Sequence, residues 1–321
     1  MMRSIKIFTI LFWIAAVLVP GIAEPLQEKP ETWLPNTEVY TYRAPGKTGE
    51  VPVADGINTI IGRTARHTVQ EGETLLDIAR RYHLGYQELV QANPDVDPWV
   101  PAVGQKIEIP SSWILPKKSD RGFVLNIPEM RLYYFLGDSQ VMTFALGVGM
   151  EGWDTPAGKF WIGEKRKDPV WYVPAAIQKE MDVPRKAIPP GPENPLGSYW
   201  MRLSTTTYGI HGTNNPWAVG RHVTHGCIRL YPEDIAYLYP RVPPKMPVEV
   251  IYQHAKVGLR DGVAYFQVYR RQATQDSDLL LELMKQVRDL ELEVDLRAMR
   301  DLLRTASNGA LVPVPLKSID D

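Results

Sequence analysis

The spacing of hydrophobic and polar positions predicts a small mixed module between residues 67 and 110. Two helical patterns, at residues 75–82 and 86–92, lie between two β-type runs, at residues 67–69 and 106–109. Thr74 precedes the first helical pattern as an N-cap, Gly85 ends it, and Asn93-Pro94 stops the second. The order of these runs predicts a β-α-α-β module of about 45 residues.

Residues 121–252 have a β texture, with short apolar runs separated by glycine and proline. The runs lie at residues 122–127, 131–136, 141–149, 159–165, 198–203, 208–213 and 247–252. This texture favours a sandwich or barrel over alternating βα units. One helix is predicted at residues 233–239, with Pro232 at its first turn. The fold class is therefore predicted to be mainly β.

The flanking segments have weaker patterns. Residues 24–66 read as a proline-rich linker with edge strands near 51–53 and 58–61. Residues 253–273 read as a β-hairpin turned at Asp261-Gly262. An apolar stripe that includes Leu280, Leu283 and Val287 predicts one amphipathic helix over 274–306, followed by a tail at 307–321. The helix either packs on its own chain or pairs with a partner chain as a short coiled coil.

The first 23 residues have the layout of a secretory signal peptide. Arg3 and Lys6 precede an apolar run at 7–19, and small residues stand before a cleavage point after Ala23. The run is short for a bilayer span, although an uncleaved anchor is the alternative. We therefore expect export, and the absence of a cysteine at the cleavage point argues against lipoprotein processing.

Export changes the meaning of Cys227, which is the single cysteine of 321 residues. Oxidising compartments favour disulfides, but one thiol has no partner in its own chain. It is therefore either reactive or a buried bystander. The formal net charge of −1 provides no basic field for nucleic acid. Twenty-eight prolines and 24 glycines agree with a chain rich in strands and loops.

The stretch HGTNNPWAVGRHVTHGCIRL, residues 211–230, surrounds this cysteine with histidines and glycines. A structural zinc site usually needs a second close ligand pair, which the spacing lacks, so no metal is expected. Nucleophilic catalysis needs an imidazole that lowers the thiol pKa by forming a thiolate–imidazolium pair. The amides of Gly226 and Cys227 are candidates for binding an oxyanion. The residues alone leave a buried, inert thiol as the competing interpretation.

These residues resemble the signature of the L,D-transpeptidases, the YkuD-type catalytic domain, in which a histidine precedes an [S/T]-H-G-C motif. His211 precedes Cys227 by sixteen positions, and Thr224 to Leu230 read T-H-G-C-I-R-L. The resemblance extends to TPAGKF at 155–160, to IPPGP at 188–192 and to NPLG at 194–197. It covers about residues 121–252 and implies the β-sandwich or barrel fold of that family.

The resemblance implies a role for each matching residue. Cys227 is the nucleophile, His211 is its base, and Gly212 supplies a backbone carbonyl that orients the histidine. His225 and Gly226, together with Cys227, contribute oxyanion-binding amides.

Two further charged or titratable residues lie in the same stretch. Arg229 either steadies the site or a substrate carboxylate, or forms a salt bridge to Asp234. His222 matches no position of the signature and is expected to be a solvated loop histidine. Trp153, Trp171, Tyr199, Trp200 and Trp217 either wall the site and exclude water or belong to the core.

The implied reaction joins peptidoglycan stem peptides and needs no cofactor. The thiolate attacks the bond between diaminopimelate and D-Ala of a donor tetrapeptide, D-Ala leaves, and the thioester passes to an amine. The acceptor is a second stem, which gives a 3→3 cross-link, or a lysine of an outer-membrane lipoprotein. Water as acceptor would make the enzyme a hydrolase. A wall-binding protein with a vestigial site is a third interpretation.

Residues 67–110 resemble LysM, a module that binds glycans containing N-acetylglucosamine. The matching segments are VQEGETL at 69–75 and ANP at 92–94. The resemblance implies that the loops around Gly72, Thr74, Asn93 and Pro94 contact glycan strands, unless the module is only a spacer. LysM followed by this catalytic domain is typical of exported enzymes that act on Gram-negative peptidoglycan, which implies a periplasmic location.

Overall fold

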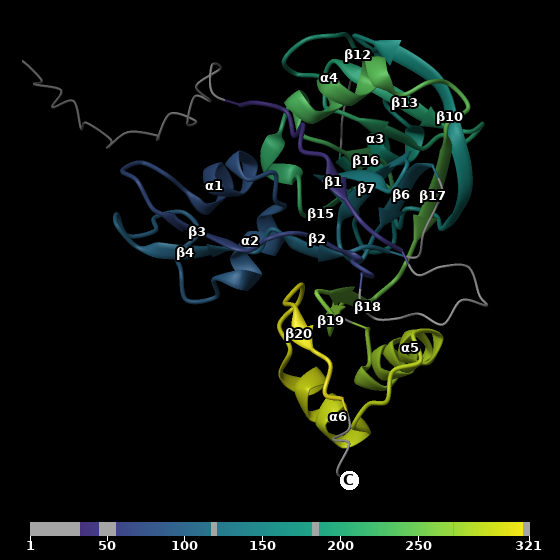
Figure 1. Ribbon diagram of the computed structural model, residues 1–321. Helices are drawn as coiled ribbons and strands as arrows, with labels where there is room; N and C mark the ends of the chain where they lie inside the picture. Colours follow the sequence, from purple (N-terminus) through teal and green to yellow (C-terminus); the bar gives the residue numbers. More distant parts are fainter. Residues whose placement is uncertain (1–32, 45–55, 117–120, 182–185, 272, 317–321) are drawn as a thin grey trace, which may run out of the picture. The chain divides into compact units, whose positions relative to one another are not determined.

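A nine-stranded sheet forms the centre of the computed structural model, which describes residues 33–44, 56–116, 121–181, 186–271 and 273–316 (Figure 1). The order of its strands is β1-β8-β7-β6-β17-β10-β13-β14-β16. In chain order these strands are β1 (Tyr40–Thr41), β6 (Gly122–Asn126), β7 (Arg131–Gly137), β8 (Gln140–Ala145), β10 (Gly158–Lys167), β13 (Tyr199–Leu203), β14 (Gly209–His211), β16 (Ile228–Arg229) and β17 (Pro247–Ile251).

The strand predictions of residues 121–252 are confirmed, except that one predicted strand forms two separate strands and several short elements were not predicted. The run at 141–149 separates into β8 and β9 (Val148–Gly149), and β9 pairs in parallel with β15 (His222–Thr224) instead of joining the main sheet. The two-residue strands β11 (Trp171–Tyr172) and β12 (Ala187–Ile188), which pair with each other, were too short to give a periodic signal. Helix α3 (Ala175–Met181) was also not predicted.

Both faces of the central strands are covered, because every residue of β6 is buried. One face contributes Phe123 and Leu125 to the main core, and the other contributes Val124 to a second core shared with the β-α-α-β module. Helix α4 (Pro232–Arg241) adds Ile235 and Leu238 to the main core and begins at Pro232 as predicted. Because both faces of β6 are buried, the strand is expected to be continuously apolar, whereas a strand with one solvated face would alternate apolar and polar residues.

The β-α-α-β prediction is confirmed in order and nearly in bounds. The elements are β3 (Ala65–Thr68), α1 (Leu75–Arg81), α2 (Tyr86–Ala92) and β4 (Lys106–Ile109), and β3 pairs with β4. Thr74 caps α1, and its hydroxyl and the carboxylate of Asp77 form a reciprocal capping box. The predicted role of Gly85 was wrong: α1 ends at Arg81, and Gly85 is the N-cap of α2.

Two buried arginines hold this module against the central sheet and α4. Arg80 donates through Nε and Nη2 to both carboxylate oxygens of Glu233, at 2.9 and 2.8 Å. Arg131 of β7, which is fully buried, donates to Glu88 of α2 at 2.6 Å and stacks on Trp113. Two-pronged arginine–carboxylate contacts fix orientation as well as distance.

The backbone of α2 also meets the segment that leads into β15. The amides of Tyr86 and Gln87 donate to the carbonyls of Val219 and Gly220, both at 3.2 Å. Gly220 has φ +78°, and a Cβ there would lie 2.2 Å from the Tyr86 nitrogen. Only glycine permits so close an approach of two backbones.

The segment before the module contributes edge strands, as predicted. β1 pairs with β8 at the edge of the main sheet, and β2 (Ile60–Gly62) pairs with β5 (Ser112–Ile114). The predicted strand at 51–53 lies outside the described residues. The same holds for the signal peptide at 1–23. Across the part of the chain that is described, no helix combines the length and apolarity that a bilayer span requires.

The C-terminal region begins with the predicted hairpin. β18 (Ala255–Arg260) and β19 (Val263–Val268) are joined at Asp261 and Gly262, whose φ angles are +51° and +77°. Two positive φ angles are the signature of a type I′ turn. The tail prediction for 307–321 was wrong in part, because β20 (Val312–Pro313) pairs with β19.

The single helix predicted over 274–306 is wrong, since the chain forms α5 (Asp276–Asp289) and α6 (Leu296–Thr305). Glu291 has φ +53°, which breaks the first helix, and Asp295 caps the second with its side chain. Leu283 and Val287 of the apolar stripe are buried in a core with β18 and β19. The alternative in which the stripe packs on its own chain is therefore the one observed.

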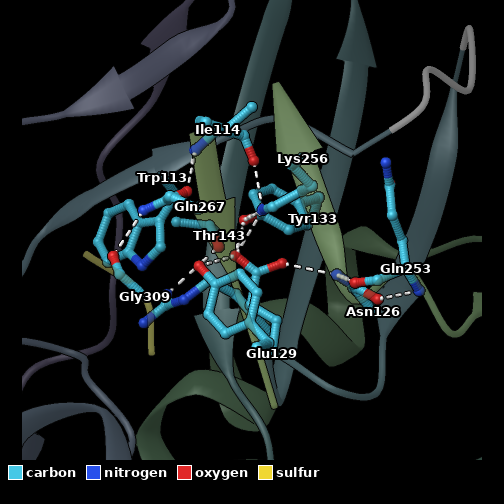
Figure 2. A network of polar contacts seen from close by, with 12 residues as sticks. Trp113, Ile114, Asn126, Glu129, Tyr133, Thr143, Gln253, Lys256, Gln267 and Gly309 are labelled. Carbon is cyan, nitrogen blue, oxygen red and sulfur yellow. Dashed lines mark hydrogen bonds and ion pairs between the residues drawn. The ribbon is translucent and has the colours of Figure 1, made fainter. Parts of the chain in front are cut away.

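A buried ion pair ties the hairpin to the central sheet (Figure 2). Lys256 of β18 and Glu129, in the β6–β7 turn, are 0% and 1% exposed, and their Nζ and Oε1 atoms are 2.7 Å apart. Tyr133 and Tyr269 donate their hydroxyls to the same Oε1, and Asn126 donates to Oε2 at 3.0 Å. Each charge is therefore surrounded by hydrogen-bond partners, as a buried charge requires.

Candidate active site

Strand register places the predicted base and nucleophile on one face of the sheet. β14 and β16 are parallel, with Ile210 opposite Ile228 and His211 opposite Arg229. The two isoleucines are fully buried in the core, so the alternate residues of both strands face the other way. Cys227 stands two positions before Arg229 and lies on the same side as His211. Both side chains line one cavity of about 480 Å³.

The imidazole of His211 is buried and held in one orientation. Its Nδ1 lies 2.6 Å from the carbonyl oxygen of Gly212. Because a carbonyl only accepts, Nδ1 carries the proton, and Nε2 is left as a lone-pair acceptor. This contact is the one that the family resemblance implies for the Gly212 carbonyl. The pKa of His211 is lowered to about 3, mainly by burial and also by the charge of Arg229, while the Gly212 contact opposes both effects.

The turn that carries Cys227 is locked by two threonines. Thr224 Oγ1 accepts from the Gly226 amide at 3.2 Å and donates to the Cys227 carbonyl at 2.6 Å. Thr155 Oγ1 donates to the Gly226 carbonyl at 3.0 Å. Gly226 has φ +94°, and a Cβ there would lie 2.5 Å from the Tyr208 ring. The predicted oxyanion role of the Gly226 amide needs correction, because its hydrogen bond to Thr224 already occupies it.

The thiol of Cys227 is partly buried. Burial raises its pKa above the ordinary value, while a backbone hydrogen bond with Gly209 and the charge of Arg229 oppose the rise. With the pKa of His211 lowered, the electrostatics favour a neutral thiol beside a neutral imidazole. The resting thiolate–imidazolium pair expected from the sequence is therefore not the favoured state, since burial penalises both charged forms.

Arg229 contributes a positive charge to this site instead of pairing with Asp234. Asp234 is fully buried elsewhere and accepts the Asn36 amide at 2.8 Å. Among the ion pairs of the described residues none joins it to Arg229, so of the two alternatives for Arg229 the salt bridge is not the one observed. Burial lowers the pKa of Arg229, and Cys227 opposes this. The guanidinium favours a negative charge on the sulfur and disfavours a positive charge on His211.

The single cysteine allows these electrostatics to be tested without substrate. We expect the pH midpoint of Cys227 alkylation by iodoacetamide to lie above that of free cysteine, because burial disfavours the thiolate. Arg229→Gln should move the midpoint further up, since it removes a charge that lowers the thiol pKa. Arg304→Gln, in an exposed pair on α6, is the matched control and should leave it unchanged. A wild-type midpoint below that of free cysteine would instead indicate a resting ion pair.

Aromatic and cationic side chains wall the cavity. Of the five predicted aromatic walls, Trp153, Trp171 and Trp200 line it. Tyr199 packs against the main core and Tyr239, and Trp217 is not among the lining residues. His225, another lining residue, packs edge-to-face on Trp153 with ring centroids 4.9 Å apart. Such contacts orient the His225 ring against the cavity wall.

His222 is not the solvated loop histidine that the sequence suggested. It lies on β15, half-buried, and its Nδ1 is 3.1 Å from the Gly149 carbonyl. Burial lowers its pKa. The pairing of β15 with β9 could not be inferred from two such short strands.

The four predicted glycan contacts divide into two kinds. Gly72 and Pro94 are exposed, whereas Thr74 and Asn93 are buried and use their side chains within the module. Asn93 donates to the Leu89 and Glu108 carbonyls, both at 2.9 Å, and accepts from the Glu108 amide at 2.7 Å. These two polar side chains therefore maintain the loops, and their predicted contact with glycan is not supported.

Three polar residues near the cavity had no predicted role. Thr224 fixes the turn that carries Cys227, and Arg166 and Arg202 line the cavity beside Trp200. The two arginines lie on strands β10 and β13, and the strand register that places them in the same cavity as His211 could not be read from the sequence. Within the described residues, no three His, Cys, Asp or Glu side chains are grouped so that they could hold a metal ion.

Known proteins are similar to this chain over two of its regions. The profile of the L,D-transpeptidase catalytic domain (YkuD) matches residues 120–250, and that of the LysM domain matches residues 67–110. The chain is 35% identical over 238 residues to the probable L,D-transpeptidase YcfS of Escherichia coli K12, covering 70% of this chain and 74% of that protein. It is 34% identical over 232 residues to the probable L,D-transpeptidase ErfK/SrfK of Salmonella typhimurium, covering 68% and 75%.

A solved structure is also similar over part of the chain. The NMR structure of the catalytic domain from the E. faecium L,D-transpeptidase is 22% identical, covers 42% of this chain and all of that domain, and has a TM-score of 0.34. The family assignment depends instead on the two relatives and on the domain profiles. On that basis, this chain, which carries a LysM domain before its catalytic domain, belongs to the L,D-transpeptidase family.

Proposed function

We propose that the chain is a cysteine-dependent L,D-transpeptidase of peptidoglycan in which Cys227 is the nucleophile and His211 its base. The donor is a tetrapeptide stem, cleaved between diaminopimelate and D-Ala. The observation that carries the proposal is the orientation of His211. With Nδ1 held 2.6 Å from the Gly212 carbonyl, the lone pair of Nε2 is available in the cavity that also contains the Cys227 thiol.

Acylation then proceeds from two neutral groups. As the sulfur bonds to the diaminopimelate carbonyl carbon, the S–H proton passes to His211 Nε2 and the carbonyl oxygen becomes negative. The amides of His225 and Cys227 are the remaining candidates to bind this oxyanion. When the C–N bond breaks, the imidazolium returns the proton to the leaving nitrogen, and D-Ala departs as an amine. A thioester on Cys227 remains.

Burial affects the two halves of this proton transfer in opposite ways. A lowered pKa keeps His211 unprotonated at neutral pH but makes the imidazole a weaker base toward the thiol. The same low pKa makes the transient imidazolium a strong acid toward the leaving amine. Arg229 stabilises the sulfur while it is negative, since its charge lowers the thiol pKa. The charge separation therefore exists only during the reaction, inside a site that is neutral at rest.

Transfer repeats the same steps with an incoming amine. The amine nitrogen attacks the thioester and gives its proton to His211, and collapse of the adduct expels the sulfur, which takes the proton back. Water competes for the same carbonyl. The aromatic walls formed by Trp153, Trp171 and Trp200 reduce its access, which favours transfer over hydrolysis.

The setting that we propose is the periplasm, with peptidoglycan as both substrate and anchor. The LysM domain would hold the enzyme on glycan strands, and the catalytic domain would act on their stems. The acceptor amine would come from a second stem or from an outer-membrane lipoprotein lysine. The apolar residues of helices α5 and α6 are buried in a core that they share with β18 and β19. A partner protein is therefore not needed to cover them.

Analysis of muropeptides tests the proposed reaction. We expect the purified protein to release D-Ala from tetrapeptide stems and to form 3→3 dimers, detected by mass spectrometry. A parallel reaction with added lipoprotein shows whether its lysine competes as acceptor. Shortened monomers without dimers or lipoprotein conjugates would contradict transfer and indicate hydrolysis. No D-Ala release from any stem would contradict the assigned bond.

A further inference from the structure

A row of side chains crosses four strands of the sheet and passes through the site. Register places Arg166 of β10 opposite Trp200 of β13, Trp200 opposite His211 of β14, and His211 opposite Arg229 of β16. Residues directly opposite one another in a sheet share a face. All four side chains line the cavity, so the row forms one of its walls. Strands β10, β13 and β16 of this row are labelled in Figure 1.

Two guanidinium groups meet at the far end of this row. Arg202 stands two positions after Trp200 and faces the same way, and both Arg166 and Arg202 have their Cζ atoms 5.9 Å from the Trp200 ring centroid. Glu164 joins them: Oε1 lies 2.5 Å from Arg166 Nε, and Oε2 lies 2.7 Å from Arg202 Nη2. One carboxylate thus holds two guanidinium groups, and the cluster keeps a net positive charge.

The two guanidinium groups are preorganised but accessible. The side chains of Arg166 and Arg202 are 46% and 37% exposed. Each guanidinium has five N–H donors, of which Glu164 occupies only a few. Among the described residues that line the cavity, three are arginines and none is Asp or Glu. The cavity therefore offers a positively charged wall without a competing carboxylate on its surface.

We propose that Arg166 and Arg202 form a subsite that binds a carboxylate of the donor stem. This carboxylate belongs to the part of the stem that stays on the enzyme as the acyl group after D-Ala leaves. The proposal rests on the proposed function, because it assumes that the stem peptide enters this cavity. A stem that has lost D-Ala still carries free carboxylates, one on the residue before diaminopimelate and one on the diaminopimelate side chain. A guanidinium fork matches either of them.

The dimensions of the row agree with this assignment. Neighbouring strands are about 4.8 Å apart, so Arg166 lies two strands, or about 10 Å, from His211 along the sheet. An extended peptide advances about 3.3–3.6 Å per residue, so one residue step covers about a third of this separation, and the side chains of the bound residue and of the arginine supply the rest. The Trp200 ring between the two positions provides an apolar surface for the intervening chain.

Matched donors and variants test the subsite. Three donor tetrapeptides are compared: the free acid, one amidated on the residue before diaminopimelate, and one amidated on the diaminopimelate side chain. For wild type, we expect one amidated donor to show a KM about tenfold higher with little change in kcat, because the contact is made equally in ground and transition states. The donor that loses affinity identifies which carboxylate is bound.

The variants Arg202→Gln and Arg166→Gln should raise KM for the free acid to a similar extent and leave it unchanged for that amidated donor. Arg202→Lys keeps the positive charge but loses the forked guanidinium, so its KM for the free acid should lie between those of wild type and Arg202→Gln. Arg304→Gln, an arginine of an exposed pair on α6, is the control and should behave as wild type. Equal effects of the cavity variants on acid and amide donors would show a structural role and would overturn the proposal.

Binding separates this inference from the proposed function. The dissociation constants of the same donors are measured with Cys227→Ala, which cannot react, and with Cys227→Ala combined with Arg202→Gln. Preference of the first protein for the acid donor, lost in the second, supports the subsite whether or not turnover is observed. Equal affinity of the single and double variants for the acid donor overturns it, even if wild type transfers stems normally.

Discussion

Cys227→Ala is expected to abolish D-Ala release and cross-linking while leaving the fold intact. The variant removes the atom that forms the thioester, and no second cysteine in the 321 residues can replace it. Loss of a nucleophile that acts together with its base typically costs roughly 10⁴- to 10⁶-fold in kcat. Muropeptide analysis measures the loss, and thermal denaturation checks that the variant is folded.

Two comparisons make this result specific. Retention of Cys227→Ala on purified sacculi should match wild type, because the LysM domain lies elsewhere in the chain. His211→Gln should lose activity to a comparable degree, since it removes the Nε2 lone pair that is proposed to accept the thiol proton. Full activity of Cys227→Ala would exclude every mechanism that depends on this sulfur, and loss of sacculus binding would show that catalysis and anchoring are not separable.

Lys256→Met is expected to destabilise the folded protein by about 3–5 kcal/mol, the usual result of removing one partner from a buried ion pair. Glu129 would keep its charge in a place where it is 1% exposed and would lose its contact with the Lys256 ammonium. The two tyrosines and Asn126 would still donate to it, which places the effect within this range instead of above it. Urea denaturation measures the free energy of unfolding.

The double variant Glu129→Gln/Lys256→Met distinguishes a lost ion pair from lost packing. Removing both charges should recover much of the stability, because neither buried charge is then left alone. Arg304→Ala, which breaks an exposed pair on α6, serves as the surface control and should leave the free energy of unfolding nearly unchanged. If Lys256→Met also has no effect, the hairpin is not held to the central sheet by this pair.

Local signals explain which parts of the fold could be predicted from the sequence. Thr74, the helical spacing that follows it and Asn93-Pro94 are close in sequence, so the β-α-α-β module was predicted almost to the residue. The type I′ turn at Asp261-Gly262 is equally local. The break between α5 and α6 was missed because the apolar stripe continues past Leu290, whereas Glu291 with its positive φ carries no distinctive signal.

The candidate site likewise combines features that a local sequence signal predicts with features that depend on the folded chain. Cys227 and His211 were found from a contiguous motif, and the carbonyl of Gly212 is adjacent to the histidine it orients. The occupied amide of Gly226 depends on Thr224, whose hydroxyl direction a sequence does not reveal. The protonation of the pair depends on burial, which belongs to the folded chain. The row from Arg166 to Arg229 needs the register of strands that lie far apart in sequence.

The central claim is that a stem peptide is carried as a thioester on the sulfur of Cys227. Intact-mass spectrometry of the protein mixed with a donor tetrapeptide, followed by peptide mapping, tests this most directly. The account predicts an adduct with the mass of the stem minus D-Ala, located on the peptide that contains Cys227, and removed when an acceptor amine is added. An adduct on another residue, or D-Ala release that persists in Cys227→Ala, would contradict it.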